Sequence, residues 1–545
     1  MINRRPHVRP VLVCLKAFCS AILLCLFGAC GSSVTDVPNR LTTDAGSDGP
    51  APIQGEPAGR VSIKLPQSDV FIVQGTTVDV PVTVERVDGY SGPVLLRFGP
   101  VPDKITASSV TIPSGQTAGT LAVQVAADHT QGKVDPISVK ASRDAADSTR
   151  GEASLNLFVR GPSGAVDTTF GVGGVTSGTL AAPAKFTHAA VQADGKIVAV
   201  GADTVIKAVR FTADGQLDTT FGAGGVAATT MAVIDGCFPR VAIDSMGRVL
   251  VSGTDLTVNP MRAAVTRFTP SGQPDLAWGA GGLASVPDPG VGATSEGFDL
   301  GFGPLGTVLL VTSTPNESLR ILRLSSSGAL DTNYNSPLGY RTLRAPADGS
   351  PYFSVGGRLD VGADGTALVA YSASPDGSAY EPMLSAVPAD GNTRTSTALG
   401  AGATTSTGYD VLVARATDGR ATMAFPGTNG KAQLRRFAPD LSQDLTFGGA
   451  GSVEAFAGSA TSLQILADGR ILLAGTATPA IQIALQRFNG DGTPDTKFGP
   501  GGLTVVSVAA TQPVVRGAFL QRDGRLLVVG NSGSPGASMI LRVWL

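Results

Sequence analysis

An internal repeat limits the possible folds of this chain more than any other feature of its sequence. Seven short segments combine a glycine turn with an apolar strand: QADGKIVAVG, DSMGRVLVSG, GPLGTVLLVT, GADGTALVAY, ATDGRATMAF, LADGRILLAG and QRDGRLLVVG. Their turn glycines are Gly195, Gly247, Gly306, Gly365, Gly419, Gly469 and Gly524, at intervals of 52, 59, 59, 54, 50 and 55 residues. A period in this range predicts a solenoid or a propeller.

A second repeated element accompanies the first. One copy is AVRFTADGQLDTTFGAGGV at 208–226, and related runs are AVTRFTPSGQPDLAWGAGGL, ILRLSSSGALDTNYN, QLRRFAPDLSQDLTFGGAGSV and ALQRFNGDGTPDTKFGPGGL. Each repeat thus supplies about four β-rich segments, the content of one propeller blade. We therefore predict a seven-bladed β-propeller over 161–545. An open β-solenoid is the alternative, although solenoids usually have shorter repeats and polar terminal caps.

The repeated motifs also resemble a known family. A DTTFG-type run, an ADGK-type turn and an RF-type strand return in fixed order, as in the delta-60 repeats of bacterial secreted and surface proteins, over most of 165–545. The resemblance implies a β-propeller-like architecture without an established activity. The fourth copy departs from the pattern, because it has Ala386 and Val387 at the RF position and no DTTFG equivalent. The regularity of that blade stays open.

Residues 60–160 have a different pattern, made of short alternating runs bounded by Gly, Pro, Asp or Ser. The runs are VSIKL, DVFIVQG, TVDVPVTVERV, PVLLRFG, SSVTIP, GTLAVQVAAD, PISVKAS and ASLNLFV. Such spacing predicts an antiparallel β-sandwich. The pattern resembles the immunoglobulin-like modules of bacterial surface proteins, which implies a spacer or an adhesive unit. We expect a spacer, because no cluster of Asp, His or aromatic residues marks a site. Together with the repeats, this predicts an all-β chain.

The first residues are basic and the next ones are apolar. The basic residues are Arg4, Arg5, Arg9 and Lys16, and no acidic residue precedes Cys30. The apolar run at 17–27 is shorter than the about 20 residues that a membrane-spanning helix needs. The pattern predicts a cleaved secretory signal over 1–29 rather than a membrane span.

The end of this signal suggests a lipid anchor. Phe27, Gly28, Ala29 and Cys30 resemble the bacterial lipobox, although leucine is more usual than phenylalanine at its first position. The resemblance implies that Cys30 becomes the N-terminus and carries lipid chains, which would anchor the protein stably. Ordinary cleavage beside an incidental cysteine is the alternative. Gly31 does not resemble the aspartate associated with inner-membrane retention, so we expect the outer membrane, on its periplasmic or surface face.

Behind the predicted anchor, residues 30–59 are rich in Gly, Ser, Asp, Pro and Thr without apolar periodicity, which predicts a flexible tether. Three of the five cysteines lie in the predicted signal and Cys30 would be lipidated, which leaves Cys237. A single thiol excludes an internal disulfide framework. Because no histidine lies near Cys237 in sequence, we expect a buried small side chain there rather than a nucleophile.

Charge restricts the possible partners. The predicted signal holds four of the 41 basic residues and none of the 43 acidic ones, so the mature chain has 37 basic residues, 43 acidic residues and a net charge of −6. We therefore do not expect a nucleic acid as partner. The expected partners are the membrane, through the lipid, and an unknown extracellular protein or glycan. We expect a monomer without a cofactor.

No motif points to a metal or a catalytic site. The run FNGDGTPD at 488–495 suggests a calcium loop, but an EF-type loop would begin on Arg487 and lacks the glutamate at its twelfth position. The mature chain has two histidines, His129 and His188, and no GxSxG or HExxH run. His188 lies in the alternating run FTHAAVQ and is interpreted as a strand residue. The GAGG and GVGG runs precede strands rather than the helix that a phosphate site needs.

Two function classes therefore remain. The first is a binding or structural surface module, in which a face of the propeller presents the site. The second is a propeller enzyme, a lyase or hydrolase of extracellular glycans, whose catalytic residues would converge on the central channel and break the repeat pattern. We favour the non-enzyme, because the recognised breaks in pattern are losses such as Ala386 rather than gains of His, Glu or Tyr.

Charged pairs recur within the repeats. An arginine precedes an aspartate by eight residues in Arg210 and Asp218, Arg267 and Asp275, Arg323 and Asp331, Arg436 and Asp444, and Arg487 and Asp495. A three-residue loop such as 213–215 would place the two members opposite each other, where such a pair contributes about 0.2–1 kcal/mol and mainly fixes the register. The fourth repeat has Ala386 and Arg394 there, so both members are lost together. Copied solvent-facing polar residues are the alternative.

Two members of this series are unmatched. Asp167 begins the first repeat without a preceding arginine, and Arg542 ends the last repeat without a following aspartate. We predict that the segment near Asp167 completes the final blade beside MILRVWL, with Arg542 close to Asp167, so that the two ends of the repeat region close the ring.

Overall fold

The computed structural model describes residues 59–65, 69–177, 185–232, 238–287, 296–313, 319–343, 353–374, 380–399, 411–508, 512–532 and 537–545. All of them belong to one compact unit, Pro57–Leu545. The predicted signal, Cys30 and nearly all of the predicted tether lie outside the described residues, as does Cys237. The helices in these ranges are 3-10 turns, η1 (Pro304–Gly306), η2 (Phe447–Gly449) and η3 (Pro500–Gly502). No helix in this part of the chain is long and apolar enough to span a membrane.

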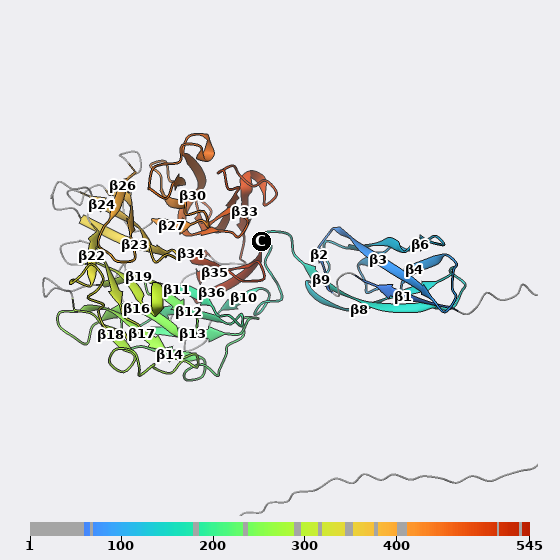
Figure 1. Ribbon diagram of the computed structural model, residues 1–545, viewed down its shortest axis with the longest axis horizontal. Helices are drawn as coiled ribbons and strands as arrows, with labels where there is room; N and C mark the ends of the chain where they lie inside the picture. Colours follow the sequence, from blue (N-terminus) through green and yellow to red (C-terminus); the bar gives the residue numbers. More distant parts are fainter. Residues whose placement is uncertain are drawn as a thin grey trace, which may run out of the picture. The chain divides into compact units, whose positions relative to one another are not determined.

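The N-terminal sandwich, residues 60–160, consists of two sheets that share one hydrophobic core (Figure 1). One sheet has the order β1-β3-β7-β5, with β1 (Arg60–Lys64), β3 (Thr77–Val87), β7 (Ala118–Val125) and β5 (Ile105–Ala107). The other has the order β2-β9-β8-β4-β6, with β2 (Asp69–Val73), β9 (Gly151–Arg160), β8 (Gly132–Ser142), β4 (Val94–Phe98) and β6 (Val110–Ile112). In β3, Val80, Val82 and Val84 are buried and their neighbours are not, as expected for a strand with one face on the core.

One pair of strands departs from the predicted antiparallel sandwich. β2 pairs with β9 in parallel, from Asp69 beside Asn156 to Val73 beside Arg160. These strands are far apart in sequence, so no tight hairpin forces them into an antiparallel arrangement. β5 was also not predicted, because three residues are too few to show an alternating pattern.

The described repeats fold into antiparallel sheets, of which five have four strands and one, shared by two repeats, has seven, so the predicted all-β architecture is confirmed. The first two sheets consist of β11 (Phe186–Val191), β12 (Ile197–Ala202), β13 (Ile206–Phe211) and β14 (Val226–Ala228), and of β15 (Val241–Ile243), β16 (Val249–Asp255), β17 (Arg262–Phe268) and β18 (Leu283–Ser285). The third sheet consists of β19 (Glu296–Phe302), β20 (Val308–Ser313), β21 (Leu319–Leu324) and β22 (Tyr340–Leu343). The fourth consists of β23 (Phe353–Val361), β24 (Ala367–Ser374), β25 (Glu381–Val387) and β26 (Thr395–Ala398). The fourth repeat, which the sequence left open, thus has the same strand order as its neighbours.

The remaining repeats continue the series. Their strands are β27 (Leu412–Arg415), β28 (Ala421–Pro426), β29 (Lys431–Phe437), β30 (Ser452–Ile465), β31 (Ile471–Ala477), β32 (Gln482–Phe488) and β33 (Leu503–Val506), then β34 (Val514–Leu520), β35 (Arg525–Ser532), β36 (Ala537–Trp544) and β10 (Val175–Ser177). β30 serves two sheets, because residues 452–457 pair with β29 and residues 458–465 pair with β31.

The first strands of the sheets form a closed series. Contacts run from β11 through β15, β19, β23, β27 and β30 to β34, and β34 contacts β11. In Figure 1, β11, β19, β23, β27 and β34 lie towards the centre of this part, with β14, β18, β22 and β26 at the rim. The described repeats therefore form a propeller-like ring rather than an open array.

Apolar contacts between neighbouring sheets hold the ring together. Val198 and Val200 of β12, for example, pack in one cluster with Val249 and Val251 of β16. The middle strands bury both faces, and every residue of β16 and β24 is buried. The repeated strands consequently read as continuous apolar runs instead of alternating ones.

The last sheet combines the two ends of the repeat region. Its order is β10-β36-β35-β34, and β10 pairs with β36 through Val175 and Leu541. The backbone N–H of Asp167 also donates to the carbonyl of Arg542 at 2.8 Å. The segment that begins the repeats therefore supplies the outermost strand of the final sheet.

Candidate functional site

The repeated arginines and aspartates form ion pairs. Arginine Nε lies 2.7–2.8 Å from aspartate Oδ2 in Arg210 and Asp218, Arg267 and Asp275, Arg323 and Asp331, Arg436 and Asp444, Arg487 and Asp495, and Arg542 and Asp167. In the first of these, Phe211 pairs with Leu217 across the loop 213–215, and the N–H of Asp218 donates to the carbonyl of Arg210 at 2.9 Å. The two members therefore face each other across a tight hairpin.

Each of these arginines also contacts an aromatic ring, and most reach the neighbouring sheet. The guanidinium of Arg542 lies 4.7 Å from the ring centroid of Phe170, and its Nη1 donates to the carbonyl of Ala213 at 2.7 Å. Arg210 stacks on Phe221 in the same way, at 4.6 Å. A planar cation is suited to this combination of stacking and hydrogen bonding. We call the arginine, the aspartate and the aromatic residue the inter-sheet clamp.

The clamp is a structural device rather than a chemical site. The hydrogen bond from Thr220 and the nearby charge of Arg210 lower the pKa of Asp218 to about 2, although burial acts in the opposite direction. Asp218 is therefore an anion at neutral pH, and its charge is paired with that of Arg210. In the fourth repeat Ala386 is partly buried and packs against the core, and the turn at Ala389 still accepts a hydrogen bond from Arg323 of the preceding sheet.

A different repeat position forms the best candidate site. The residues seven before the turn glycines are His188, Arg240, Asp299, Arg358, Leu412, Ser462 and Gly517. All of them line one cavity of about 180 Å³, and all lie on or beside the first strands of the sheets. We call this the axial position. It differs in chemistry from repeat to repeat, whereas the turn glycine and most clamp residues do not.

β-bulges help to aim the axial side chains. The register shifts just before the axial residue in five of the described first strands: between Phe186 and His188, Gly297 and Asp299, Val355 and Arg358, Ala460 and Ser462, and Val515 and Gly517. A bulge bends a strand and redirects the side chains beside it, and bulges are frequent next to active sites.

Some axial side chains connect neighbouring sheets. His188 Nδ1 accepts the backbone N–H of Val241 at 3.3 Å, and a carboxylate oxygen of Asp299 accepts that of Leu359 at 3.0 Å. The hydroxyl of Ser462 donates to the carbonyl of Ala518 at 2.8 Å. His, Asp and Ser thus use polar atoms to satisfy the backbone of the next sheet.

Arg240 is in a different situation. Its side chain is 7% exposed, and its buried Nε has no hydrogen-bond partner. Burial and the nearby charge of Arg358 lower its pKa to about 9, although the carboxylate of Asp299 acts in the opposite direction, so Arg240 is still a cation at neutral pH. Burial also lowers the pKa of His188 well below its usual value, with Arg240 and Arg358 acting in the same direction, so the imidazole is neutral. The described lining of the cavity therefore contains two guanidiniums, one carboxylate and a neutral histidine.

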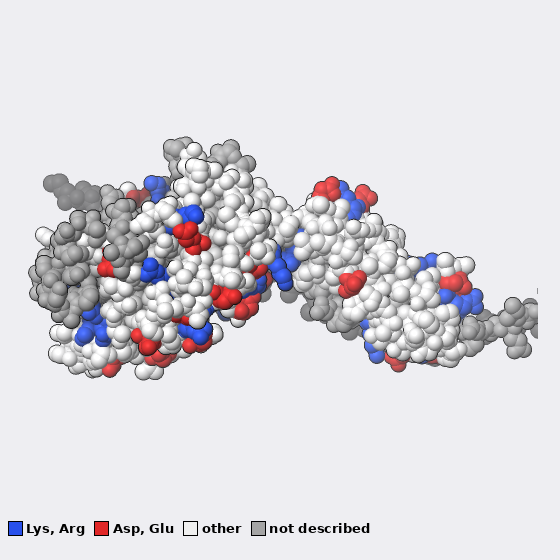
Figure 2. All heavy atoms as spheres, turned by 90° about the horizontal axis from the view of Figure 1, so that it is seen from above, with Lys and Arg blue, Asp and Glu red and all other residues white. Residues whose placement is uncertain are grey.

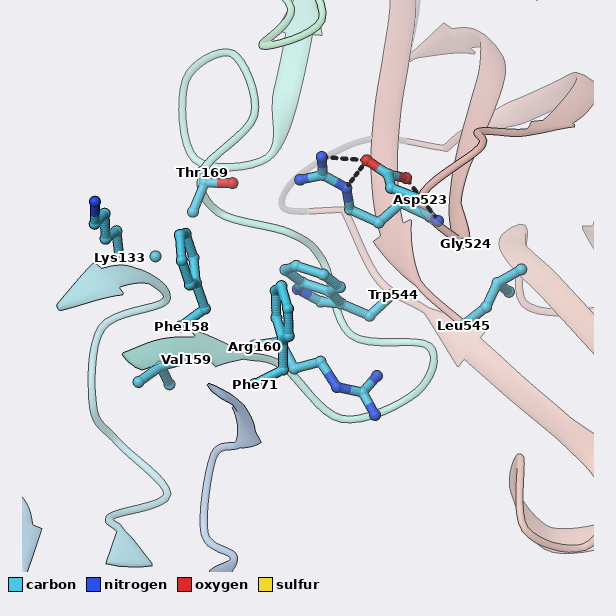
Figure 3. A pocket seen from close by; sticks show the side chains of 12 residues that line it. Phe71, Lys133, Phe158, Val159, Arg160, Thr169, Asp523, Gly524, Trp544 and Leu545 are labelled. Atoms are coloured by element: carbon cyan, nitrogen blue, oxygen red, sulfur yellow. Dashed lines mark hydrogen bonds and ion pairs between the residues drawn. The ribbon is translucent and has the colours of Figure 1, made fainter. Parts of the chain in front are cut away.

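A second, larger cavity of about 620 Å³ lies between β9 and β36 (Figure 3). Phe71 and Phe158 stack in it with centroids 5.3 Å apart, and Lys133 lies 6.0 Å from the Phe158 ring. On the other side, Arg525 lies 5.4 Å from the ring of Trp544. This wall is aromatic and basic.

The outer surface offers no comparable concentration of charge on the face that Figure 2 draws. Basic and acidic side chains are interspersed there, and most of the visible surface belongs to other residues. No group of three or more His, Cys, Asp or Glu residues in the described ranges is placed to hold a metal ion. In the run at 488–495, Asp491 accepts hydrogen bonds from Thr493, and Asp495 pairs with Arg487 and Arg470.

The sequence prediction placed His188 in a strand and missed its role at the axis. From the sequence we also recognised only losses of repeated residues, such as Ala386. We missed the axial position, where some repeats have the polar residues His188, Arg240, Asp299 and Arg358 and another has Leu412. A count of seven residues back from each turn glycine would have found the set. His129, the other histidine, lies in the sandwich, partly buried, with Nδ1 2.6 Å from the carbonyl oxygen of Thr130.

Two segments of the chain match one protein-family model. Its description is "Domain of unknown function (DUF5122) beta-propeller", and it matches residues 192–221 and 466–498. The family is related to the delta-60 repeats, so the resemblance noted above is shown for these parts of the first and sixth repeats. No curated protein matches the chain in sequence.

Several solved structures are similar to this chain at low identity. The BP39L lectin from Burkholderia pseudomallei is 10% identical, with coverage of 66% of this chain and 96% of that chain and a TM-score of 0.41. A protein of unknown function from Dyadobacter fermentans is 16% identical, with coverage of 68% and 99% and a TM-score of 0.34. The six-bladed lectin from Aleuria aurantia is 8% identical, with coverage of 71% and 94% and a TM-score of 0.29. No statement about function follows from likenesses this distant.

Proposed function

We propose that the protein is a lipid-anchored bacterial surface module that binds a ligand at the axis of a seven-bladed β-propeller. In this proposal Cys30 carries the lipid, residues 30–59 are the tether, and residues 60–160 are an immunoglobulin-like spacer. The outer membrane is the proposed location. An extracellular glycan or protein is the proposed class of partner.

The divergence of the axial position carries this proposal. Positions that only build the fold have the same residue in most repeats, because every junction between sheets makes the same demands. At the axial position the residues are instead His188, Arg240, Asp299, Arg358, Leu412, Ser462 and Gly517. A closed ring brings equivalent positions to one place, so different residues there create a single asymmetric site. Concave sites with a few convergent polar groups are the usual form of ligand sites.

The contacts of the axial groups favour binding over catalysis. Nδ1 of His188 and the carboxylate of Asp299 both accept backbone N–H groups, the latter from Leu300 at 2.9 Å and Leu359 at 3.0 Å. These acceptors are therefore already used in holding the ring. A general base needs an acceptor within hydrogen-bond reach of the substrate's proton.

A glycan hydrolase or lyase is the second candidate, and one observation favours it. Asp360, two residues beyond Arg358 on β23, has its pKa raised by burial and by the nearby charge of Asp299. Two carboxyl groups in different electrostatic environments are the usual equipment of glycoside hydrolysis. Against this role, Asp360 accepts the N–H of Arg415 at 2.8 Å.

Arrays of polysaccharides and extracellular proteins, probed with the purified mature protein, test both candidates. We expect saturable binding that Arg240→Leu weakens and that Arg522→Leu, a change at an exposed residue, leaves unchanged. Release of any shortened glycan, abolished by Asp360→Asn, would establish the enzyme and defeat the binding module. Absence of binding to every class on the arrays would also count against the proposal.

A further inference from the structure

We infer that the axial cavity takes an oxyanion, a carboxylate, phosphate or sulfate group of the ligand, against Arg240 and Arg358. This inference rests on the proposed binding function and names the chemistry that the site selects. Among the described residues that line it, the cavity holds two guanidiniums and one carboxylate, that of Asp299. That carboxylate also accepts two backbone N–H groups.

The burial of Arg240 is the first step of the argument. Removing a cation from water is costly unless an anion or several hydrogen bonds compensate for it. Arg240 is 7% exposed, and its Nε has no hydrogen-bond partner among the described residues. The nearby carboxylate that favours its charged form, that of Asp299, already accepts two backbone N–H groups. Leu412 and Gly517 occupy the equivalent position in other repeats, so the ring does not need an arginine there to close. We therefore attribute the buried cation to an anionic group of a ligand that enters the cavity.

The other donors of the cavity fit the same ligand. Thr461 also lines the cavity, and its buried hydroxyl has no hydrogen-bond partner. Because Nδ1 of His188 accepts the N–H of Val241, the neutral ring carries its proton on Nε2. A hydroxyl and an imidazole N–H complement guanidinium groups, which bind carboxylate and phosphate oxygens through paired hydrogen bonds.

The size of the cavity agrees with this assignment. About 10–15 Å³ of such space holds one water molecule, and the axial cavity measures about 180 Å³. It therefore has room for an oxyanion together with part of the molecule that carries it.

Calorimetric titration of the mature protein with inorganic phosphate, sulfate and glucuronate, at constant ionic strength, tests the inference. Glucose, which is neutral, is the control ligand. We expect saturable binding of at least one anion at one site per chain and no binding of glucose. Arg240→Leu and Arg358→Leu should each weaken that binding by about tenfold or more, which is the usual worth of a charge-assisted hydrogen bond. Arg522→Leu should leave it unchanged.

Thermal unfolding separates a binding role from a structural one. Arg240→Leu removes a buried cation whose Nε has no hydrogen-bond partner among the described residues, so the variant should unfold at a higher temperature than the wild type without anion. It should also lose the rise in Tm that the anion gives the wild type. Absence of anion binding in the wild type, or equal affinities in wild type and both variants, would overturn the inference. Arrays that show binding of neutral glycans alone would overturn it too, but would leave the proposed binding function standing. Anion binding by the purified protein, without binding of any glycan or protein on the arrays, would support the anion site but count against the proposed binding function.

Discussion

Asp167 offers a direct test of how the ring is closed. Its carboxylate is fully buried, and Oδ2 lies 2.7 Å from Nε of Arg542 and 2.9 Å from Nη1 of Arg525. Oδ1 accepts the N–H and the hydroxyl of Thr169 at 3.1 and 2.6 Å. Asp167→Ala would leave two cations without their common partner, and breaking a buried pair of this kind costs about 3–5 kcal/mol.

The expected shift in Tm follows from the size of the ring. Residues 161–545 number 385, so an unfolding entropy of about 2.1 cal/mol/K per residue converts this loss into a Tm about 4–6 °C lower. Urea unfolding followed by tryptophan fluorescence suits the measurement, because Trp544 lies two residues beyond Arg542. Asp444→Ala is the matched control, since its pair with Arg436 has the same geometry but both side chains are 13% exposed. We expect it to cost about 1.5–3 kcal/mol.

A double-mutant cycle decides whether Asp167 and Arg542 act as a pair. Arg542 is 1% exposed, so Arg542→Met places an apolar side chain in an apolar site beside Phe170. The double variant should be more stable than the sum of the two single losses predicts, by about 1.5 kcal/mol or more. Additive losses, or a loss at Asp167 no larger than that at Asp444, would refute closure through this pair.

Three further predictions concern other parts of the chain. Gly215 has φ +80, and a Cβ there would lie 2.6–2.7 Å from Thr176 and Phe170, whereas Gly224 has φ +63 and open space around it. Gly215→Ala should therefore cost about 1–3 kcal/mol more than Gly224→Ala in urea unfolding, and equal costs would contradict the packing argument. Burial lowers the pKa of His188, so below pH 6.5 this histidine is protonated in the unfolded chain but not in the folded one. The free energy of unfolding therefore falls as the pH falls. The slope is at most about 1.4 kcal/mol per pH unit, and His188→Gln should reduce it; an unchanged slope would contradict this. Cys30→Ala should move the protein from the detergent phase to the aqueous phase, and unchanged partitioning would contradict the lipid anchor.

Local sequence patterns could predict the hairpins of the clamp because its covalent spacing is short. An arginine and an aspartate eight residues apart, with a turn between them that is a glycine turn in most repeats, have few ways to form a hairpin, and the observed loop 213–215 is one of them. The aromatic partner was not predicted. Phe170 follows Asp167 by three residues, but its contact with Arg542 exists only after the ring has closed. Spacing along the chain does not show which residues meet across sheets.

The axial residues could not be predicted from motifs for a related reason. His188, Arg240 and Asp299 each lie in or beside an ordinary strand, and none of them has a chemical partner nearby in sequence. Their convergence depends on ring closure, and their orientation depends in part on bulges such as the shift between Phe186 and His188. A bulge adds one unpaired residue to a strand, which a period-two pattern does not reveal.

The repeats therefore contain two kinds of position, clamp and axial, and comparing the repeats within this one sequence distinguishes them. Clamp residues recur because every junction must satisfy the same backbone groups, and a change there weakens the fold. Axial residues are free to differ, because the ring tolerates Leu412 and Gly517 where it also has Arg240. It follows that exchanging axial residues between repeats should alter what the protein binds while the sheets remain intact. The specificity of this ring lies where its repeats differ.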